Sequence, residues 1–218
     1  MDGHDQTGRI REFWDAYAQD YDSEPDHGLV SGPMRRAWRL LLEDVMPPPP
    51  ADVVEFGCGT GTVTEILADL GHLVDASDIA PEMIRRAKAK TARFAGQVAV
   101  RVADAGAPVT RLAAVDVVIA RHLVWTLPSP EKSLRRWVSM LRPGGRLVLV
   151  EGHWGMPSPQ SYVGGPPLRW EGGVRAEDLV AALRPHVARI DVTDLDSVAL
   201  WGRTTSDERY LLVAHAAS

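Results

Sequence analysis

From residue 51 onward, short runs rich in β-branched residues alternate with segments of helical periodicity. The pattern predicts strands at 51–56, 72–77, 98–102, 114–120 and 145–151, and helices near 61–70, 81–94 and 131–141. Strands that alternate with helices are joined by right-handed crossovers. We therefore expect a mostly parallel sheet with helices on both faces.

The last part of the chain shows a different order of elements. A helix is expected at about 176–184, and two β-rich runs follow it at 189–196 and 209–216. The sequence between these runs has no helical pattern, so they are expected to form a final antiparallel hairpin. The expected fold class is therefore α/β, with a Rossmann-like sheet of seven strands.

The first fifty residues predict a helical cap. Apolar and aromatic side chains recur at helical spacing through 9–21, and a second helix is expected to begin at Pro33. Four prolines at 47–50 end that helix. We interpret 1–218 as a single domain, in which the cap at 1–50 precedes a cofactor-binding half at 51–151. The remainder, 152–218, begins with a Gly- and Pro-rich loop at 152–174, whose length is typical of a functional lid.

Composition excludes several classes of protein. The single cysteine, Cys58, permits neither an intrachain disulfide nor a thiolate zinc cluster, and it suits a reducing cytoplasm. A net charge of −5 offers no electrostatic footprint for nucleic acid. No stretch approaches the roughly 20 apolar residues of a membrane helix, and the polar start does not resemble a signal peptide. We expect a cytoplasmic protein that binds no nucleic acid, membrane or metal.

The strongest local signal is the glycine-rich segment VVEFGCGTGTVTE at 53–65. Gly57 and Gly59 allow the backbone to turn tightly and to approach a ligand. Gly61 opens the next helix, where Thr62 and Glu65 fit a capping box.

The pattern of this loop disfavours a dinucleotide. A pyrophosphate loop reads G-x-G-x-x-G or G-x-G-x-x-A, but Thr62 stands at the sixth position here. Glu55, two residues before the first glycine, would repel a pyrophosphate and would suit an ammonium group. The residues therefore point away from a nicotinamide cofactor.

A second signal follows at the end of the next expected strand. Asp78 stands where an acid can accept hydrogen bonds from both hydroxyls of a ribose. The alternative role for Asp78 is a helix N-cap ahead of Pro81, and Asp75 is a rival acid within the strand. Together with the glycine loop, Asp78 favours a nucleoside-containing ligand.

These motifs carry a family resemblance. VVEFGCGTG, DIAPEMI, VRVADAG, DVVIARHLVWTL and LRPGGRLVLVEG follow one another in the order of a class I S-adenosylmethionine-dependent methyltransferase. The chain most resembles the small-molecule enzymes of the methyltransferase-11 type. The resemblance covers about 51–151, and FWDAYAQDYD in the cap also resembles the helix and tyrosine that close over the cofactor in that group.

The resemblance implies S-adenosylmethionine as the cofactor and assigns a part of it to each matching residue. At the methionine portion, the resemblance places Glu55 and Gly57, with Arg121 near the carboxylate or sulfonium. Cys58, Gly59 and Gly61 would lie along the glycine loop. At the nucleoside, it places Asp78 beside the ribose, Ile79 and Met83 beside the adenine, and Asp104 and Ala105 at the adenine amino group. Tyr21 would lie over the site from the cap. Three of these residues have ordinary alternatives: Met83 as core, Asp104 as a turn residue, and Arg121 as a surface charge.

The implied reaction is an in-line methyl transfer to N, O or C of a small-molecule acceptor. His122 and His153 follow the fourth and fifth expected strands and are the candidate catalytic bases, since ligands bind at the carboxyl ends of such strands. Trp14, His27, Trp125 and Trp154 are candidates for contacting the acceptor. Structural roles for these histidines and packing roles for these tryptophans remain open alternatives.

Two other functions are considered. One is a non-catalytic S-adenosylmethionine-binding regulatory or assembly protein, and the other is a nicotinamide-dependent oxidoreductase. DNA amino-methylating enzymes resemble one another in carrying an acidic or Asn residue, two prolines and an aromatic residue after the fourth strand. This chain reads ARHLVW at that place, so this class of enzyme is disfavoured. An Arg-rich, Lys-poor composition resembles proteins of high-GC bacteria and suggests secondary metabolism. The oligomeric state is open, with a homodimer as one alternative.

Overall fold

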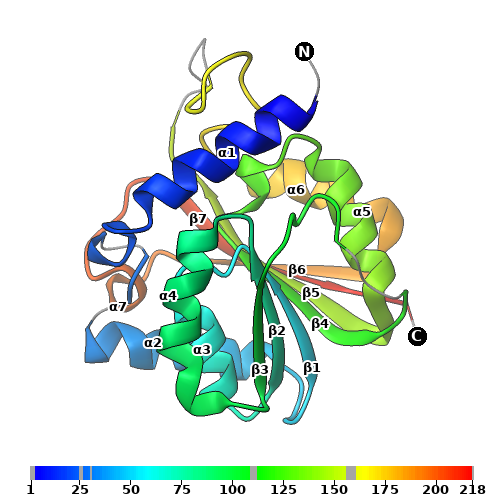
Figure 1. Ribbon diagram of the computed structural model, residues 1–218. Coiled ribbons are helices and arrows are strands. Elements are labelled where there is room, and N and C mark those ends of the chain that lie inside the picture. The colour runs from blue at the N-terminus through cyan, green and yellow to red at the C-terminus, as the bar shows by residue number, and fades with distance from the viewer. Residues whose placement is uncertain (1–2, 25–26, 30, 109–111, 156–160, 218) are drawn as a thin grey trace.

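The computed structural model describes residues 3–24, 27–29, 31–108, 112–155 and 161–217. Within these ranges a seven-stranded sheet runs in the order β3-β2-β1-β4-β5-β7-β6 (Figure 1). The strands are β1 (Asp52–Phe56), β2 (Leu73–Asp78), β3 (Val98–Val102), β4 (Val115–Arg121), β5 (Leu141–His153), β6 (Arg189–Asp194) and β7 (Glu208–His215). The expected Rossmann-like α/β architecture is confirmed.

The first five strands are parallel and the last two reverse direction. β1 lies between β2 and β4, with Val53 opposite Val74 on one side and Val117 on the other. β7 pairs antiparallel with both β5 and β6. The predicted C-terminal hairpin is therefore present. The prediction that no helix lies between its two strands was wrong. A short helix, α7 (Val198–Trp201), begins at Ser197, whose hydroxyl accepts the N–H of Ala199.

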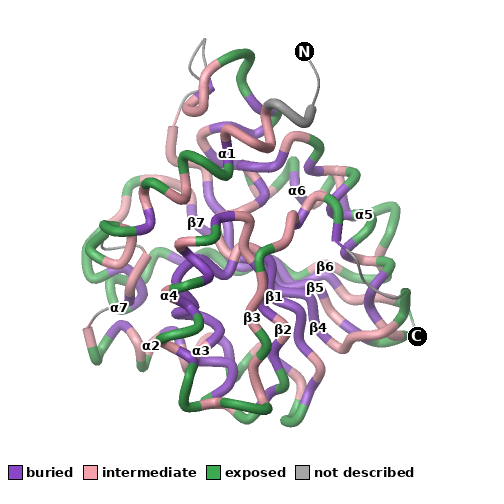
Figure 2. The backbone as a smooth tube through the Cα atoms, in the orientation of Figure 1, coloured by how far each residue is buried: buried purple, intermediate pink, exposed green. Residues whose placement is uncertain are grey.

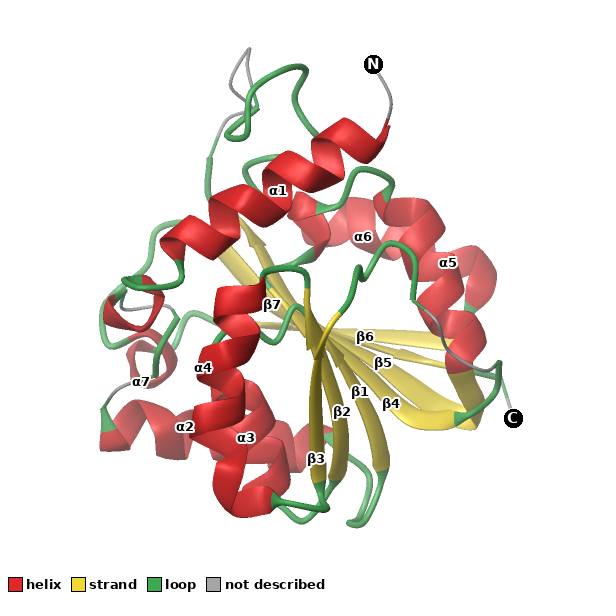
Figure 3. Cartoon of the chain, in the orientation of Figure 1, coloured by secondary structure: helices red, strands yellow, loops and turns green. Residues whose placement is uncertain are grey.

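Helices cover both faces of the sheet, as Figure 3 shows. α2 (Gly32–Val45), α3 (Thr62–Asp69), α4 (Pro81–Thr91) and α7 share a core on one face, and α5 (Pro130–Met140) and α6 (Ala176–Leu183) share a core on the other. Aromatic pairs anchor each layer. The Trp38 and Trp201 rings meet edge to face at 5.4 Å, and those of Phe56 and Trp137 stack at 5.0 Å. The central strands lie buried between the two layers (Figure 2).

The cap helix α1 (Gly3–Tyr17) lies across the carboxyl ends of the parallel strands (Figure 1). It ends four residues earlier than the predicted helix, and Tyr21 belongs instead to the 3-10 turn Tyr21–Ser23. Asp15 Oδ1 accepts the N–H of Glu82 at 2.6 Å, which joins α1 to the first turn of α4. Three further 3-10 turns are Ala92–Phe94, Val124–Thr126 and Arg184–His186.

The predicted capping box on α3 was wrong. The N-cap is Gly61, at φ +84°, and no side chain caps the helix there. Thr62 Oγ1 instead accepts a hydrogen bond from Lys90 Nζ at 2.8 Å. Glu65 forms ion pairs with Arg35 at 2.8 Å and with Arg93 at 3.1 Å. Cationic partners on neighbouring elements therefore take both side chains that the motif would have used.

The predicted lid at 152–174 lies partly outside the described residues, because 156–160 are not described. Its described end packs near α1, where the Tyr162 ring meets Phe13 at 4.9 Å. Within the described ranges, none of the helices combines the length and the apolar character that a membrane span requires.

Candidate active site

The glycine loop joins β1 to α3 and is closely approached by neighbouring side chains. Gly57, Gly59 and Gly61 have φ of +64°, +54° and +84°, a region that disfavours residues with a Cβ atom. A Cβ at Gly57 would lie 2.7 Å from Leu123 Cδ1, and one at Gly59 would lie 3.2 Å from the Tyr21 ring. The loop therefore needs glycine both for its conformation and for the close approach of its neighbours.

Asp78 fixes this loop against the start of α4. Its Oδ2 accepts the N–H of Gly59 at 3.0 Å, and its Oδ1 accepts the N–H of Ala80 at 2.9 Å. The N-cap of α4 is Ala80, so the helix-cap alternative for Asp78 does not apply. Burial raises the pKa of this carboxyl, and the backbone hydrogen bonds oppose that shift. The carboxyl is thus held at the edge of the sheet beside the glycine loop.

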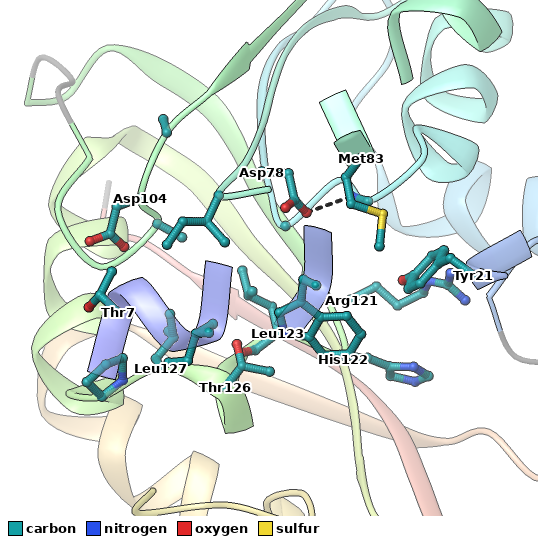
Figure 4. Close-up of a pocket in the computed structure, with 18 residues that line it drawn as sticks. Thr7, Tyr21, Asp78, Met83, Asp104, Arg121, His122, Leu123, Thr126 and Leu127 are labelled. Atoms are coloured by element: carbon teal, nitrogen blue, oxygen red, sulfur yellow. Dashed lines mark hydrogen bonds between the residues drawn. The ribbon is translucent and has the colours of Figure 1, made fainter. Parts of the chain in front are cut away.

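A cavity opens at this edge between the glycine loop, α1 and the turn after β4 (Figure 4). In Figure 4, Thr7 and Asp104 lie at one end of it, and Tyr21 and Arg121 lie at the other. Ten of the predicted site residues line it: Trp14, Tyr21, Gly57, Gly59, Asp78, Ile79, Met83, Asp104, Ala105 and Arg121. His122, a predicted catalytic residue, lines it as well. We call this space the cofactor cavity.

A smaller space adjoins the cofactor cavity at the carboxyl end of β1, lined in part by Glu55, Cys58 and Arg121. Glu55 is 4% exposed, and its Oε2 accepts the hydroxyl of Thr64 at 2.6 Å. Burial raises the pKa of Glu55 to about 7, although Thr64 and Arg121 act in the opposite direction. A cationic group placed here would favour the ionised carboxylate.

The cap is fastened to the glycine loop by a polar cluster. Lys90 Nζ, from α4, donates to Asp22 Oδ2 at 3.0 Å and to Thr60 Oγ1 at 2.9 Å. The Thr60 hydroxyl also donates to Asp22. The neighbouring Tyr21 ring stacks on His27 at 4.2 Å, and burial raises the pKa of its hydroxyl to about 12. Tyr21 is therefore a neutral, fixed side chain over the loop.

A second cavity, of about 460 Å³, lies on the other side of Trp14, Tyr21 and His122. These three side chains line both cavities and so form a shared wall. The predicted acceptor residues His27, Trp125 and Trp154 line the second cavity too, which we call the acceptor cavity. Four further lining residues were not predicted: Arg203, Ser206, Asp207 and Arg209.

His122 holds a central place in the shared wall. Its φ of +54° is unusual for a residue other than glycine. Its ring lies 5.0 Å from that of Trp154 and stacks at 5.8 Å on that of Trp201. Burial and the charge of Arg121 lower its pKa well below the ordinary value, so the imidazole is neutral. Within the described chain, its buried Nε2 has no hydrogen-bond partner.

Glu151 supports the turn that carries His122, a role not predicted from the sequence. Its Oε1 accepts the N–H groups of Leu123 at 2.9 Å and Val124 at 2.8 Å. The side chain is fully buried, and burial raises its pKa to about 8. An acid at the end of the apolar run GRLVLVE was the available signal, because a buried carboxyl needs such partners.

Other candidates take positions with ordinary partners. His153 lies opposite Glu208 in the β5–β7 ladder, bridges to Gly173, and lines neither cavity. Asp75 pairs with Arg101, away from the glycine loop. Asp104 accepts the N–H of Gly106 at 2.7 Å, so it is a turn residue as well as part of the cavity lining.

Arg121 joins the cap to the sheet. Its Nη2 donates to the His27 carbonyl at 2.9 Å, and its guanidinium lies 5.1 Å from the centre of the Trp38 ring. It is half-buried, so the surface-charge alternative does not apply.

Comparison with known proteins identifies the domain and its fold. Residues 54–149 match a family model described as a methyltransferase domain. A structure of phosphoethanolamine N-methyltransferase 1 from Haemonchus contortus, in complex with phosphoethanolamine and S-adenosylhomocysteine, aligns with 100% of this chain and 50% of its own, with a TM-score of 0.74 and 18% identity. At that identity the likeness shows the fold alone. This chain carries a class I methyltransferase domain.

Two curated relatives of the methyltransferase domain are O-methyltransferases by name. The nocamycin O-methyltransferase of Saccharothrix syringae is 35% identical over 70% of this chain and 56% of its own length. The ubiquinone biosynthesis O-methyltransferase of Xanthomonas axonopodis pv. citri (strain 306) is 31% identical over 63% of this chain and 54% of its own length. The matched part of the chain thus spans little more than half the length of these relatives.

The family match covers most of the cofactor cavity and only a small part of the acceptor cavity. It includes the glycine loop, Asp78, Asp104 and the turn after β4. It ends before Arg203 and Arg209, and it begins after α1. The acceptor side of the methyltransferase domain is therefore built largely from residues outside the shared segment. Among the described residues, no group of three or more His, Cys, Asp or Glu side chains is placed to hold a metal ion.

Proposed function

We propose that this protein transfers a methyl group from S-adenosylmethionine to an oxygen atom of a small-molecule acceptor. The observation that carries the proposal is the wall of Trp14, Tyr21 and His122 shared by the cofactor and acceptor cavities. Because the same three side chains line both cavities, the cavities adjoin there, and ligands bound in them would meet directly, as methyl transfer requires.

The residues of the cofactor cavity fit S-adenosylmethionine. Glu55, buried with a raised pKa, would form an ion pair with the cofactor's ammonium group. Each Asp78 oxygen accepts one backbone N–H and keeps a lone pair for a ribose hydroxyl. Ile79 and Met83 would hold the adenine ring, and Asp104 would accept from its amino group.

The remaining cofactor residues act on the methionine end and on the loop. Arg121 would neutralise the methionine carboxylate, since it reaches both the cofactor cavity and the space beside Glu55. Gly57 and Gly59 would let the backbone approach the cofactor, and Cys58 would line the same side. Gly61 would act indirectly, since a Cβ there would meet Ala87 of α4 at 3.0 Å.

Catalysis on this geometry needs alignment and a proton acceptor. When bound, the cofactor supplies an activated methyl group on a sulfonium. Tyr21 and Trp14 would exclude water from the shared wall. His122 is neutral, and its buried Nε2 has no hydrogen-bond partner among the described groups, so it would accept the proton of an acceptor hydroxyl. His153 lines neither cavity and receives no role in the reaction.

Oxygen is favoured over nitrogen or carbon by the names of the two curated relatives and by the neutral base. A role in secondary metabolism, a cytoplasmic location and a homodimeric state stay predictions.

Calorimetric titration of S-adenosylhomocysteine tests the cofactor assignment. Wild type is expected to bind it in the micromolar range, and Asp78→Ala to bind about tenfold or more weakly, because the ribose contact and the anchor of the glycine loop are both lost. The matched control is Asp75→Ala, which removes an acid from the same strand outside the cavity. Tight binding of NADH by the wild type, with no binding of S-adenosylhomocysteine, would contradict the proposal.

A further inference from the structure

The acceptor cavity combines aromatic walls with fixed charge. The indoles of Trp125 and Trp154 meet edge to face, with centroids 5.9 Å apart and planes at 89°. Such a corner offers one ring face and one ring edge to a planar guest, which is the geometry that aromatic pairs prefer. A volume of about 460 Å³ lies within the range of roughly 300–1,000 Å³ that small-molecule pockets occupy.

The cavity also carries positive charge from the segment between α7 and β7. Arg209 is held in place: its Nε and Nη2 each lie 2.9 Å from Asp207 Oδ2, and its guanidinium lies 4.3 Å from the centre of the Trp201 ring. Its side chain is only 5% exposed. Arg203 lines the cavity as well, so the lining holds two guanidinium groups and one carboxylate, that of Asp207.

The charged and aromatic groups lie close to the base. Arg209 is among the charges that lower the pKa of His122, and Trp154 contacts the His122 ring at 5.0 Å. Trp125 Nε1 is buried without a hydrogen-bond partner in the part of the chain that the structure describes. One small guest can therefore meet His122, the two indoles and the arginines together.

We infer that the acceptor is an aromatic hydroxy acid, whose ring lies against Trp125 and Trp154 and whose carboxylate binds Arg203 and Arg209. This inference rests on the proposed function. Guanidinium groups suit a carboxylate because they donate paired, charge-assisted hydrogen bonds. The ring hydroxyl would then face His122. The oxygen gains the methyl group as the carbon–sulfur bond breaks, the hydroxyl proton passes to His122 Nε2, and S-adenosylhomocysteine leaves.

The test uses two probes that differ in one charge. Calorimetry in the presence of saturating S-adenosylhomocysteine would compare 6-hydroxy-2-naphthoate with 6-hydroxy-2-naphthamide. We expect the acid to bind about tenfold or more tightly than the amide, because only the acid carries the charge that the arginines select. Arg203→Gln should reduce this preference at least about fivefold, and Arg203→Lys should retain most of it.

The control is Arg184→Gln, which makes the same change of net charge at an exposed position of the turn after α6. It should leave the preference unchanged. Equal binding of acid and amide by the wild type, or the same preference in Arg203→Gln, would overturn the inference. If neither probe binds while S-adenosylhomocysteine does, the acceptor class is wrong and the cofactor assignment stands. If S-adenosylhomocysteine itself does not bind, the proposed function is wrong.

Discussion

At the scale of single residues, His122 carries the sharpest expectation for catalysis. Its left-handed backbone costs roughly 1–3 kcal/mol in most residues, and asparagine tolerates it well. We therefore expect His122→Asn to keep the turn and the affinity for S-adenosylhomocysteine within about threefold, while methylation of 6-hydroxy-2-naphthoate falls about 100-fold or more, as for loss of a general base. Rates and affinity would be measured on the same preparations.

The matched control for this change is His153→Asn. His153 lines neither cavity, so its replacement should leave the rate nearly unchanged. Because the pKa of His122 is lowered well below the ordinary histidine value, the wild-type rate should show no histidine limb between pH 6.5 and 8. A His122→Asn enzyme as fast as the wild type would remove His122 from the reaction.

Prediction from sequence worked where a residue's position depends on local geometry. The three glycines and Asp78 lie within one strand–helix–strand segment, so their spacing alone indicates that they meet. Thr7 and Ile10 could have been found, because they share a helical face with Trp14 and line the cofactor cavity with it. Arg203 and Arg209 could not, because the cavity brings them beside Trp125 only through the pairing of β7 with β5.

At the scale of elements, the sequence likewise predicts features that local residues determine, and it misses features that contacts with distant residues determine. Periodicity predicted the parallel strands to within a few residues because they are short apolar runs, mostly buried in β1 and β4 and partly exposed in β3. The failures lie where a few polar contacts decide. The α3 capping box does not form, because Thr62 accepts a hydrogen bond from Lys90 and Glu65 forms ion pairs with two arginines. α7 is a single turn, too short to show a period, and it is held by burial of Trp201, whose Nε1 donates to the Leu195 carbonyl at 2.6 Å.

The contact between the cap and α4 sets how firmly the cap closes the cofactor cavity. Lys90 donates to Asp22 and Thr60, and these bonds hold the turn that carries Tyr21. We expect Lys90→Met to raise the dissociation rate of S-adenosylhomocysteine about three- to tenfold, since hydrogen bonds to a charged group contribute roughly 1.5–3 kcal/mol and these groups are partly exposed. Stopped-flow displacement would measure the rate.

Lys88→Met is the control for that measurement, because Lys88 is an exposed lysine on the same helix. Lys88→Met makes the same change of charge and of residue type on α4 as Lys90→Met, but it leaves the contact between Lys90 and Asp22 intact. An equal rise in both variants would show that charge, and not the fastening of the cap, governs release.

At the scale of the whole molecule, the buried carboxyls make stability depend on pH. Burial raises the pKa of Glu151 to about 8 and that of Glu55 to about 7. Unfolded glutamates titrate near 4.3, so between pH 6.5 and 8.5 the folded protein binds more protons than the unfolded chain. Its unfolding free energy therefore falls as pH rises.

Other groups act mainly outside this window. The lowered pKa of Asp22 and of Asp116 concerns acidic pH. The lowered pKa of His122 adds stability that is nearly complete once pH exceeds that of an unfolded histidine. The raised pKa of Cys58 acts at higher pH. The two glutamates therefore dominate between pH 6.5 and 8.5.

We expect the unfolding free energy to fall by roughly 2–3 kcal/mol across that window, about two-thirds of it from Glu151. Glu151→Gln keeps an acceptor for the N–H groups of Leu123 and Val124 but cannot ionise, so its loss should shrink to below about 1 kcal/mol. Urea denaturation at pH 6.5 and 8.5 measures both values. Glu177→Gln, which removes an exposed carboxylate of α6, should behave as the wild type. An equal fall in Glu151→Gln and wild type would show that Glu151 is already ionised at pH 6.5, and that the turn bearing His122 is held by a charged carboxylate.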